Sequence, residues 1–149
     1  SNVVAIVGFG GAADDGYLIH IGDAGGGAGK LSINRASWTF GNATVNDNTF
    51  HHIVVSFTGQ VASIYVDGSL DATSGSLGAP KTYTGRRSIG AYQSGSKILD
   101  GVVDEVEIWR RALSSSEVST LYMSGSGNQY PFTSTSTLSA RKQLLGVGI

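Results

Sequence analysis

The sequence predicts an all-β domain of short strands and tight turns, with one short helix towards its end. Composition is the first reason: 22 of the 149 residues are glycine and only 14% are charged, a balance that favours strands and turns over helices. The second reason is that short apolar runs end repeatedly in turn-forming pairs such as Asp67-Gly68. The third is that a clear helix start occurs only at Ser114-x-x-Glu117.

Length and charge limit the possible function classes. A chain of 149 residues forms one domain with a sizeable hydrophobic core. Its formal net charge of −1 gives no general attraction to nucleic acids or anionic membranes. No apolar run is long enough to span a bilayer, and the lack of cysteine excludes a disulfide framework and any cysteine-ligated metal. We therefore expect no nucleic-acid partner and no membrane span.

Four strands are expected in the first third of the chain. They cover residues 3–9, 17–21, 31–33 and 38–45, the last as an edge strand with a bend. The glycine-rich segment 23–29 lies between the second and third strands. It lacks the Gly-Lys-Ser/Thr ending and the following helix of a phosphate cradle, so we interpret it as a loop.

The rest of the chain predicts a hairpin, a further short strand and a strand that leads into the helix. Residues 50–57 are expected as a central strand, joined by a tight turn to a strand over 61–66. Residues 88–90 form a further strand. Residues 102–109 alternate as a strand does, and the capping box at Ser114 then predicts a helix over 114–123.

Three stretches in this order resemble the laminin-G-like domains of the concanavalin-A-like lectin/glucanase group. They are His51-His52 with the strand that follows, the strand ending Tyr65-Val66-Asp67-Gly68, and the strand and helix over residues 101–122. Phe50 stands where the family usually has tryptophan. The resemblance covers about residues 3–122 and implies a two-layer antiparallel β-sandwich, a jelly roll. The resemblance also implies a role in ligand binding or in structural assembly, because domains of this branch are seldom enzymes.

The chain departs from the family at both ends. Family members carry two or three further strands before the equivalent of Val3, so the first strands of the family are absent here. We expect the sandwich to cover residues 1–123, followed by a polar linker and C-terminal tail over 124–149 that could serve as an assembly arm. Three explanations stay open for the missing strands: a longer parent polypeptide, completion by the chain's own tail, or strand addition by a neighbouring subunit's tail.

The acidic residues near position 105 do not predict an enzyme. Related glucanases carry three carboxylates at alternate positions of one strand, because a nucleophile and an acid/base must flank the same bond. Here Glu105 and Glu107 share a face, but the flanking alternate positions are Val103 and Trp109. Asp104 is expected to hold a neighbouring loop through backbone amides.

Calcium is the metal that the sequence leaves open. Adjacent His51 and His52 would point to opposite sides of a strand and are poor joint zinc ligands. Calcium takes carboxylate and carbonyl oxygens from loops, and the candidate ligands are Asp14, Asp15 and Asp23. Turn formation is the competing interpretation of these aspartates.

A sugar site needs a planar aromatic ring to stack on, surrounded by amide and hydroxyl groups. The candidate ligand-binding residues are Trp38, Asn42, Tyr92 and Gln93. Packing in the core or at a sheet edge is the competing interpretation of each aromatic residue.

Two functions follow from the sequence and the resemblance. The first is a non-catalytic recognition module that binds a glycan or a cell-surface protein through loops at a sheet edge. The alternative is a structural subunit, of the virion-decoration or surface-layer type, that self-associates by exchanging a strand or its C-terminal tail. Both imply an extracellular, cell-surface or virion-surface location.

Overall fold

The computed structural model describes residues 4–9, 16–22, 25–35, 37–79, 87–92, 95–127 and 145–148. These residues form ten strands, one α-helix and one turn of 3₁₀ helix. The strands are β1 (Val4–Phe9), β2 (Tyr17–Ile21), β3 (Lys30–Asn34), β4 (Trp38–Thr44), β5 (Ile53–Thr58), β6 (Val61–Val66), β7 (Ser69–Thr73), β8 (Arg87–Ile89), β9 (Val106–Trp109) and β10 (Leu145–Gly148). The helix α1 spans Ser115–Tyr122, and the 3₁₀ turn spans Met123–Gly125.

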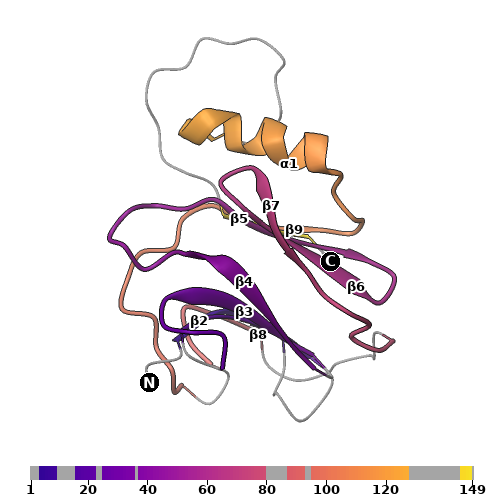
Figure 1. Cartoon of the computed structure of the whole chain (residues 1–149). Coiled ribbons are helices and arrows are strands. Elements are labelled where there is room, and N and C mark those ends of the chain that lie inside the picture. The colour runs from indigo at the N-terminus through magenta and orange to yellow at the C-terminus, as the bar shows by residue number, and fades with distance from the viewer. Residues whose placement is uncertain are drawn as a thin grey trace.

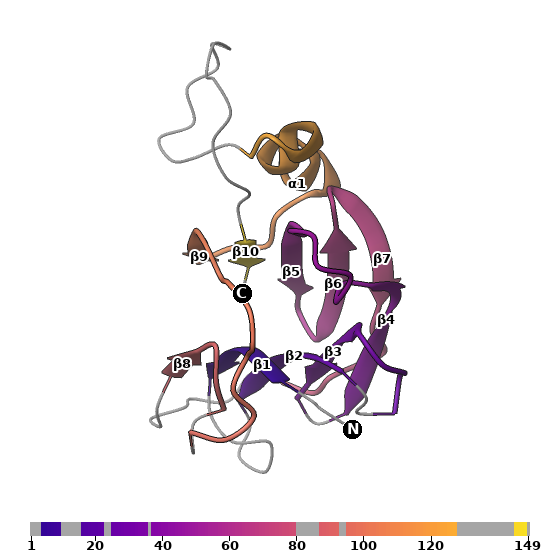
Figure 2. The same ribbon diagram turned by 90° about the vertical axis from the view of Figure 1, so that its left-hand side faces the viewer.

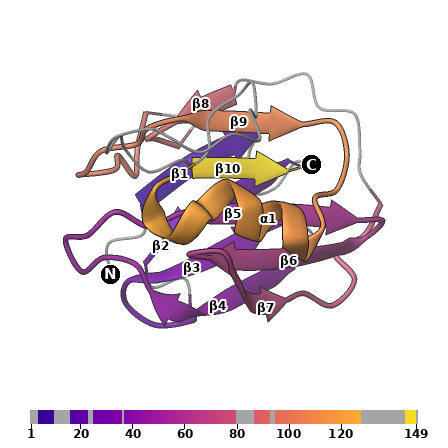
Figure 3. The same ribbon diagram turned by 90° about the horizontal axis from the view of Figure 1, so that it is seen from above.

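Two antiparallel sheets face each other and form a sandwich (Figure 1). One sheet has the order β4-β3-β2-β1-β8, and the other has the order β5-β6-β7. The pair β10-β9 lies beside β5, and α1 lies across the outer side of the second sheet (Figure 3). The predicted two-layer antiparallel sandwich with one short helix is therefore confirmed.

The core lies between the sheets and follows from the strand period of two. Ile19 and Ile33 project from the five-stranded sheet towards Val55 and Ile64 of the second sheet, and all four are at most 2% exposed. Burying one such side chain contributes roughly 1.5–3 kcal/mol. The alternate residues of β5 and β6, among them Val54 and Tyr65, point the other way and pack under α1.

The helix is fixed at its start and along one face. Ser114 and Glu117 form the predicted capping box, and Val118 and Leu121 are buried against the second sheet. Just before the helix, the Ser56 hydroxyl donates to the carbonyl of Leu113 and accepts from its amide, each at 2.9 Å. This reciprocal pair ties the loop before α1 to β5.

Two predicted strands are shorter than the sequence indicates. The strand expected over 102–109 begins only at Val106, because Glu105 has a positive φ of 52° that breaks the extended conformation. The strand expected from residue 50 begins at Ile53; it ends the ladder β5-β6-β7, and the pair β10-β9 packs along its other side. Residues 51 and 52 are held instead by Asp67, as described below.

The C-terminal segment supplies a strand. Residues of β10 pair in parallel with β9, from Leu145 opposite Val106 to Gly148 opposite Trp109. The strand beside β9 therefore comes from the chain's own end.

Within the described ranges, no helix has the length and apolar character needed to cross a membrane.

Candidate functional site

Three rings form a row on the outer face of the five-stranded sheet, away from the core. Trp38 and Phe40 on β4 stack with their planes 2° apart and their centroids 6.1 Å apart. The Trp38 ring leans across β3 towards β2, where its centroid lies 5.5 Å from that of His20. Trp38 stays 39% exposed. We call Trp38, Phe40 and His20 the aromatic row.

Buried polar groups lie in the same part of the sheet. Ser32 pairs with His20 on one side and with Phe40 on the other, so the three residues follow one line across the strands. Ser32 and His20 are at most 1% exposed. Neither the Ser32 hydroxyl nor the two His20 ring nitrogens has a hydrogen-bond partner in the part of the chain that the structure describes. A ligand reaching this point would find unused donors and acceptors.

His20 is neutral at physiological pH. Burial, and then the positive charge of Lys97, lower the pKa of His20 from 6.5 to about 4. A neutral imidazole offers one donor and one acceptor nitrogen, which suits hydroxyl groups better than it suits anions.

A glycine loop borders the aromatic row. A Cβ atom at Gly26 would overlap the Phe40 ring, and one at Gly25 would lie 3.5 Å from it. The absence of side chains therefore lets this loop lie against Phe40. The exposed partner of the stack is Trp38.

The predicted ligand-binding residues do not gather in one place. Trp38 belongs to the aromatic row, and Asn42 lies on the same strand, where its side-chain amide donates to the Asp71 carbonyl on β7. Tyr92 follows β8, at the opposite edge of the sheet from β4. It caps a tight turn, with the amide of Gly95 donating to its carbonyl, and Lys97 lies 5.8 Å from its ring. Gln93 lies outside the described residues.

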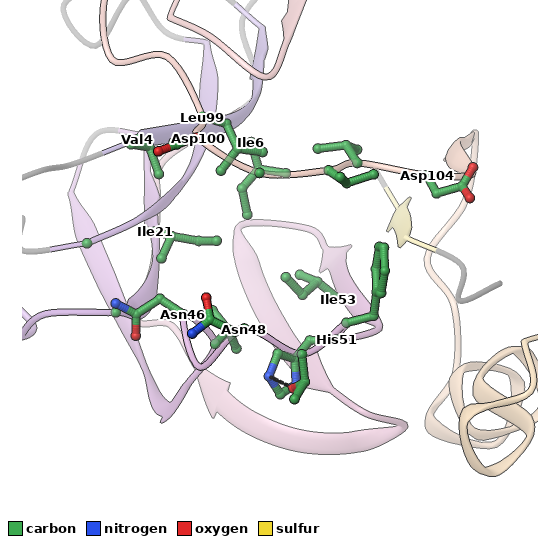
Figure 4. Close-up of a pocket in the computed structure, with 18 of the residues that line it drawn as sticks. Val4, Ile6, Ile21, Asn46, Asn48, His51, Ile53, Leu99, Asp100 and Asp104 are labelled. Carbon is green, nitrogen blue, oxygen red and sulfur yellow. Dashed lines mark hydrogen bonds between the residues drawn. The ribbon is translucent and has the colours of Figure 1, made fainter.

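A cleft of about 670 Å³ opens between the two sheets at one end of the sandwich. Figure 4 shows Val4, Ile6 and Ile21 along one wall and Ile53 on the other. Polar groups stand at its borders. They are Asn46, Asn48, Thr49 and His51 from the connection before β5, and Asp100 and Asp104 from the segment before β9. The volume is in the range of small-molecule sites.

His51 is clamped between two carboxylates. Its Nδ1 lies 2.8 Å from Oδ2 of Asp67 and its Nε2 lies 3.0 Å from Oδ1 of Asp47. Burial alone would lower the pKa of His51, but the hydrogen bonds to Asp67 and Asp47 outweigh it and raise the pKa above 6.5. The other Asp67 oxygen accepts from the amide of His52 at 2.9 Å. This network fixes the entry to β5 at the rim of the cleft.

The acidic residues of the chain do not form a metal cluster in the described ranges. There, no group of three or more His, Asp or Glu side chains could hold a metal ion. The predicted calcium ligands Asp14, Asp15 and Asp23 lie outside those ranges, and calcium stays a prediction.

Sequence reasoning missed most of the aromatic row. His20 and Ser32 were not connected to Trp38, because their proximity depends on the register of β2, β3 and β4. Phe40 carried a weak signal: its spacing of two from Trp38 puts both rings on one face of a strand.

Comparison with known proteins places the chain among sandwich proteins. Residues 1–119 match the family model described as the concanavalin A-like lectin/glucanases superfamily. A putative carbohydrate binding protein from Bacteroides ovatus ATCC 8483 aligns with a TM-score of 0.61 and 19% identity, over 80% of this chain and 36% of that one. An S-layer domain-containing protein from Clostridium thermocellum ATCC 27405 aligns with a TM-score of 0.42 and 17% identity, over 81% of this chain and 63% of that one. No curated protein matches the sequence significantly.

Proposed function

Because the chain belongs to the concanavalin A-like lectin/glucanase superfamily, we propose that it is a non-catalytic recognition module that binds a glycan at the aromatic row. The observation that carries the proposal is the stack of Trp38 on Phe40, with Trp38 39% exposed on the outer face of the five-stranded sheet. A flat aromatic face of this kind complements the apolar face of a sugar ring. A glycan partner also implies work at a cell surface or outside the cell.

The groups around Trp38 fit an uncharged polyhydroxylated ligand. Phe40 stacks on the Trp38 indole and the glycine loop lies against Phe40, so the indole loses little freedom when a ligand stacks on it. His20 and Ser32 lie next to it and have unused hydrogen-bonding capacity among the described residues.

The arrangement of carboxylates supports a binding role rather than hydrolysis. Glu105 has a positive φ and precedes β9, whereas Glu107 lies within that strand. The two residues therefore do not follow the regular alternation that would aim both at one glycosidic bond. The Bacteroides ovatus structure shares the fold, and its description as a putative carbohydrate binding protein agrees with the proposal.

A glycan array tests the proposal directly. Wild type should be retained on at least one glycan, Trp38→Ala should lose at least tenfold in affinity, and Trp38→Phe should keep part of it. Leu70→Ala is the matched control, because Leu70 is also an exposed apolar residue but lies on β7 of the other sheet. Full retention by Trp38→Ala, or no retention of wild type on any glycan, would refute the proposal.

A second candidate is a structural subunit of a surface assembly. One observation favours it: the C-terminal strand β10 follows the helical region by seventeen residues of chain and packs between β5 and β9. Negative-stain microscopy of concentrated protein should then reveal regular assemblies, and uniform single particles at all concentrations would contradict this candidate.

A further inference from the structure

The cleft between the two sheets is separate from the aromatic row. Val4 and Ile6 of β1 and Ile21 of β2 line one wall, and Ile53 of β5 lines the other (Figure 4). Trp38 lies on the outer face of the five-stranded sheet and is not one of the described residues that line the cleft. A ligand in the cleft would therefore occupy a second site, whose occupation does not depend on a glycan at Trp38.

The chain segment before β9 forms a third side of the cleft. It runs from the five-stranded sheet up to β9 (Figure 2) and contributes residues 99–104 to the lining. Val102 in this segment is 73% exposed, and Phe50, before β5, is 52% exposed. These two lining side chains continue the apolar walls out to the solvent. A ligand that covered them would remove apolar surface from water, which favours the binding of a hydrophobic group.

The size and the walls of the cleft suit a small molecule. Its volume of about 670 Å³ falls within the roughly 300–1,000 Å³ of sites that bury most of a drug-sized ligand. An extended peptide would bring backbone N–H and C=O groups against aliphatic side chains such as Ile6 and Ile53, and these groups would lose their water without gaining hydrogen-bond partners. A hydrocarbon chain has no such groups.

The border of the cleft is acidic. Asp100 and Asp104 line it on the segment before β9, and no lysine or arginine is among the described residues that line it. On the side of β5, His51 lies between the carboxylates of Asp47 and Asp67, so even a protonated imidazole neutralises only one of the two charges. A positive charge on a ligand is therefore favoured at this border over a negative charge.

Two lysines lie close to lining residues in the sequence, but their ammonium groups have other neighbours. The Nζ atom of Lys30 donates to the carbonyl of Asn42 at 3.0 Å. The Nζ atom of Lys97 lies 5.8 Å from the centroid of the Tyr92 ring. Neither lysine lines the cleft, so neither offsets the carboxylates at its border directly.

We infer that the cleft binds a small amphiphile, with its hydrocarbon chain between the two sheets and a cationic amine at the acidic border. An ammonium group offers three donors, and the side-chain amides of Asn46 and Asn48 supply further oxygen acceptors at the border (Figure 4). A chain of the same length with a carboxylate head would be repelled by Asp100 and its acidic neighbours.

An NMR titration of the full chain tests this inference, with n-octylammonium as the probe. The amide signals of Ile6, Ile53 and Val102 should shift, whereas the indole N–H signal of Trp38 should not. Octylammonium should bind at least about fivefold more tightly than octanoate. It should bind about 15-fold more tightly than hexylammonium, because each buried methylene adds about fourfold. No shifts at the three amides, or equal affinities for octylammonium and octanoate, would overturn the inference.

Variants at exposed positions distinguish the cleft from general adsorption to the surface. Phe50→Ala and Val102→Ala should each weaken octylammonium binding at least about threefold, because each removes part of an apolar wall. Leu70→Ala is the matched control, because Leu70 is 58% exposed but lies on β7 and does not line the cleft. Trp38→Ala should also leave the affinity unchanged, which separates this site from the glycan site. Unchanged affinity in both cleft variants, or an equal loss in Leu70→Ala, contradicts the inference.

Asp100→Asn tests the position of the amine. Asp100 is exposed, so the variant should keep the fold. Octylammonium affinity should fall about two- to fivefold, whereas the affinity for 1-octanol, an uncharged chain of the same length, should not change. Equal effects on the two probes would contradict the placement of the amine at the acidic border.

Discussion

Asn42 on β4 donates two hydrogen bonds to Asp71 on β7, and these bonds join the two sheets. The backbone amide of Asn42 donates to the Asp71 carboxylate at 2.8 Å, and the Asn42 side-chain amide donates to the Asp71 carbonyl at 2.5 Å. The amide of Ala43 donates to the second carboxylate oxygen at 2.9 Å. Both strands are end strands of their ladders, so this pair closes one side of the sandwich.

Replacing Asp71 should loosen that side. In Asp71→Asn, one of the two accepting oxygens becomes an NH₂ group that faces a backbone N–H, and the charge is lost. We expect the free energy of unfolding to fall by about 1.5–3 kcal/mol, measured by denaturant titration. Asp100→Asn, at an exposed position, is the control and should change stability by under about 0.5 kcal/mol. Equal effects of the two variants would contradict the role of Asp71.

Removal of His51 should have its largest effect in mild acid. Its pKa is raised in the folded state, because the hydrogen bonds to Asp67 and Asp47 outweigh burial. The stabilisation is complete below about pH 6.5 and is lost as pH rises through the folded-state pKa. The stability difference between wild type and His51→Gln should therefore be larger at pH 5.5 than at pH 8.5. A difference that grows with pH would contradict this account.

His52 should make the protein sensitive to acid. It is 1% exposed, and burial lowers its pKa to about 4, opposed by the charge of Asp67. The unfolded chain takes up a proton near pH 6.5 while the folded chain does not, so stability falls as pH drops from about 6.5 towards 4. The shift corresponds to a loss on the order of 3 kcal/mol.

His52→Phe tests this effect, because phenylalanine keeps a ring against Tyr122, whose centroid lies 5.8 Å from that of His52. Thermal unfolding between pH 7 and 4.5 should decline less steeply in the variant. His20, also buried with a pKa lowered to about 4, keeps part of the acid sensitivity. If the stability of His52→Phe fell with decreasing pH as steeply as that of the wild type, His52 would not be a source of the acid sensitivity.

The cap at Ser114 should stabilise α1 by a measurable amount. The Ser114 hydroxyl accepts from the amide of Glu117, and the Glu117 carboxylate accepts from the amide of Ser114 at 2.9 Å. Ser114→Ala should lower the free energy of unfolding by about 0.5–2 kcal/mol. Ser119→Ala, on the exposed side of the same helix, should be neutral or slightly stabilising. A loss of stability equal in both variants would argue against the cap.

Local patterns in the sequence predicted the elements whose stability is itself local. The capping box at Ser114 fixed the start of the helix, and the hairpin between β5 and β6 follows from a two-residue turn. Where tertiary contacts compete with the local pattern, the prediction was wrong. The His52 amide donates to the Asp67 carboxylate instead of to a neighbouring strand, so β5 starts later than expected. The positive φ of Glu105 interrupts the strand expected over residues 102–109.

Taken alone, the sequence determined that this chain forms an antiparallel sandwich with one capped helix, because periodicity, turns and caps are encoded within a few residues of one another. The tertiary structure decided which side chains meet. Trp38 lies beside His20 and Phe40 rather than beside Tyr92. Asn42 is hydrogen bonded to Asp71, and β10 lies between β5 and β9. These relations join residues that strand register and sheet order bring together from distant parts of the chain, so no short stretch of sequence contains them.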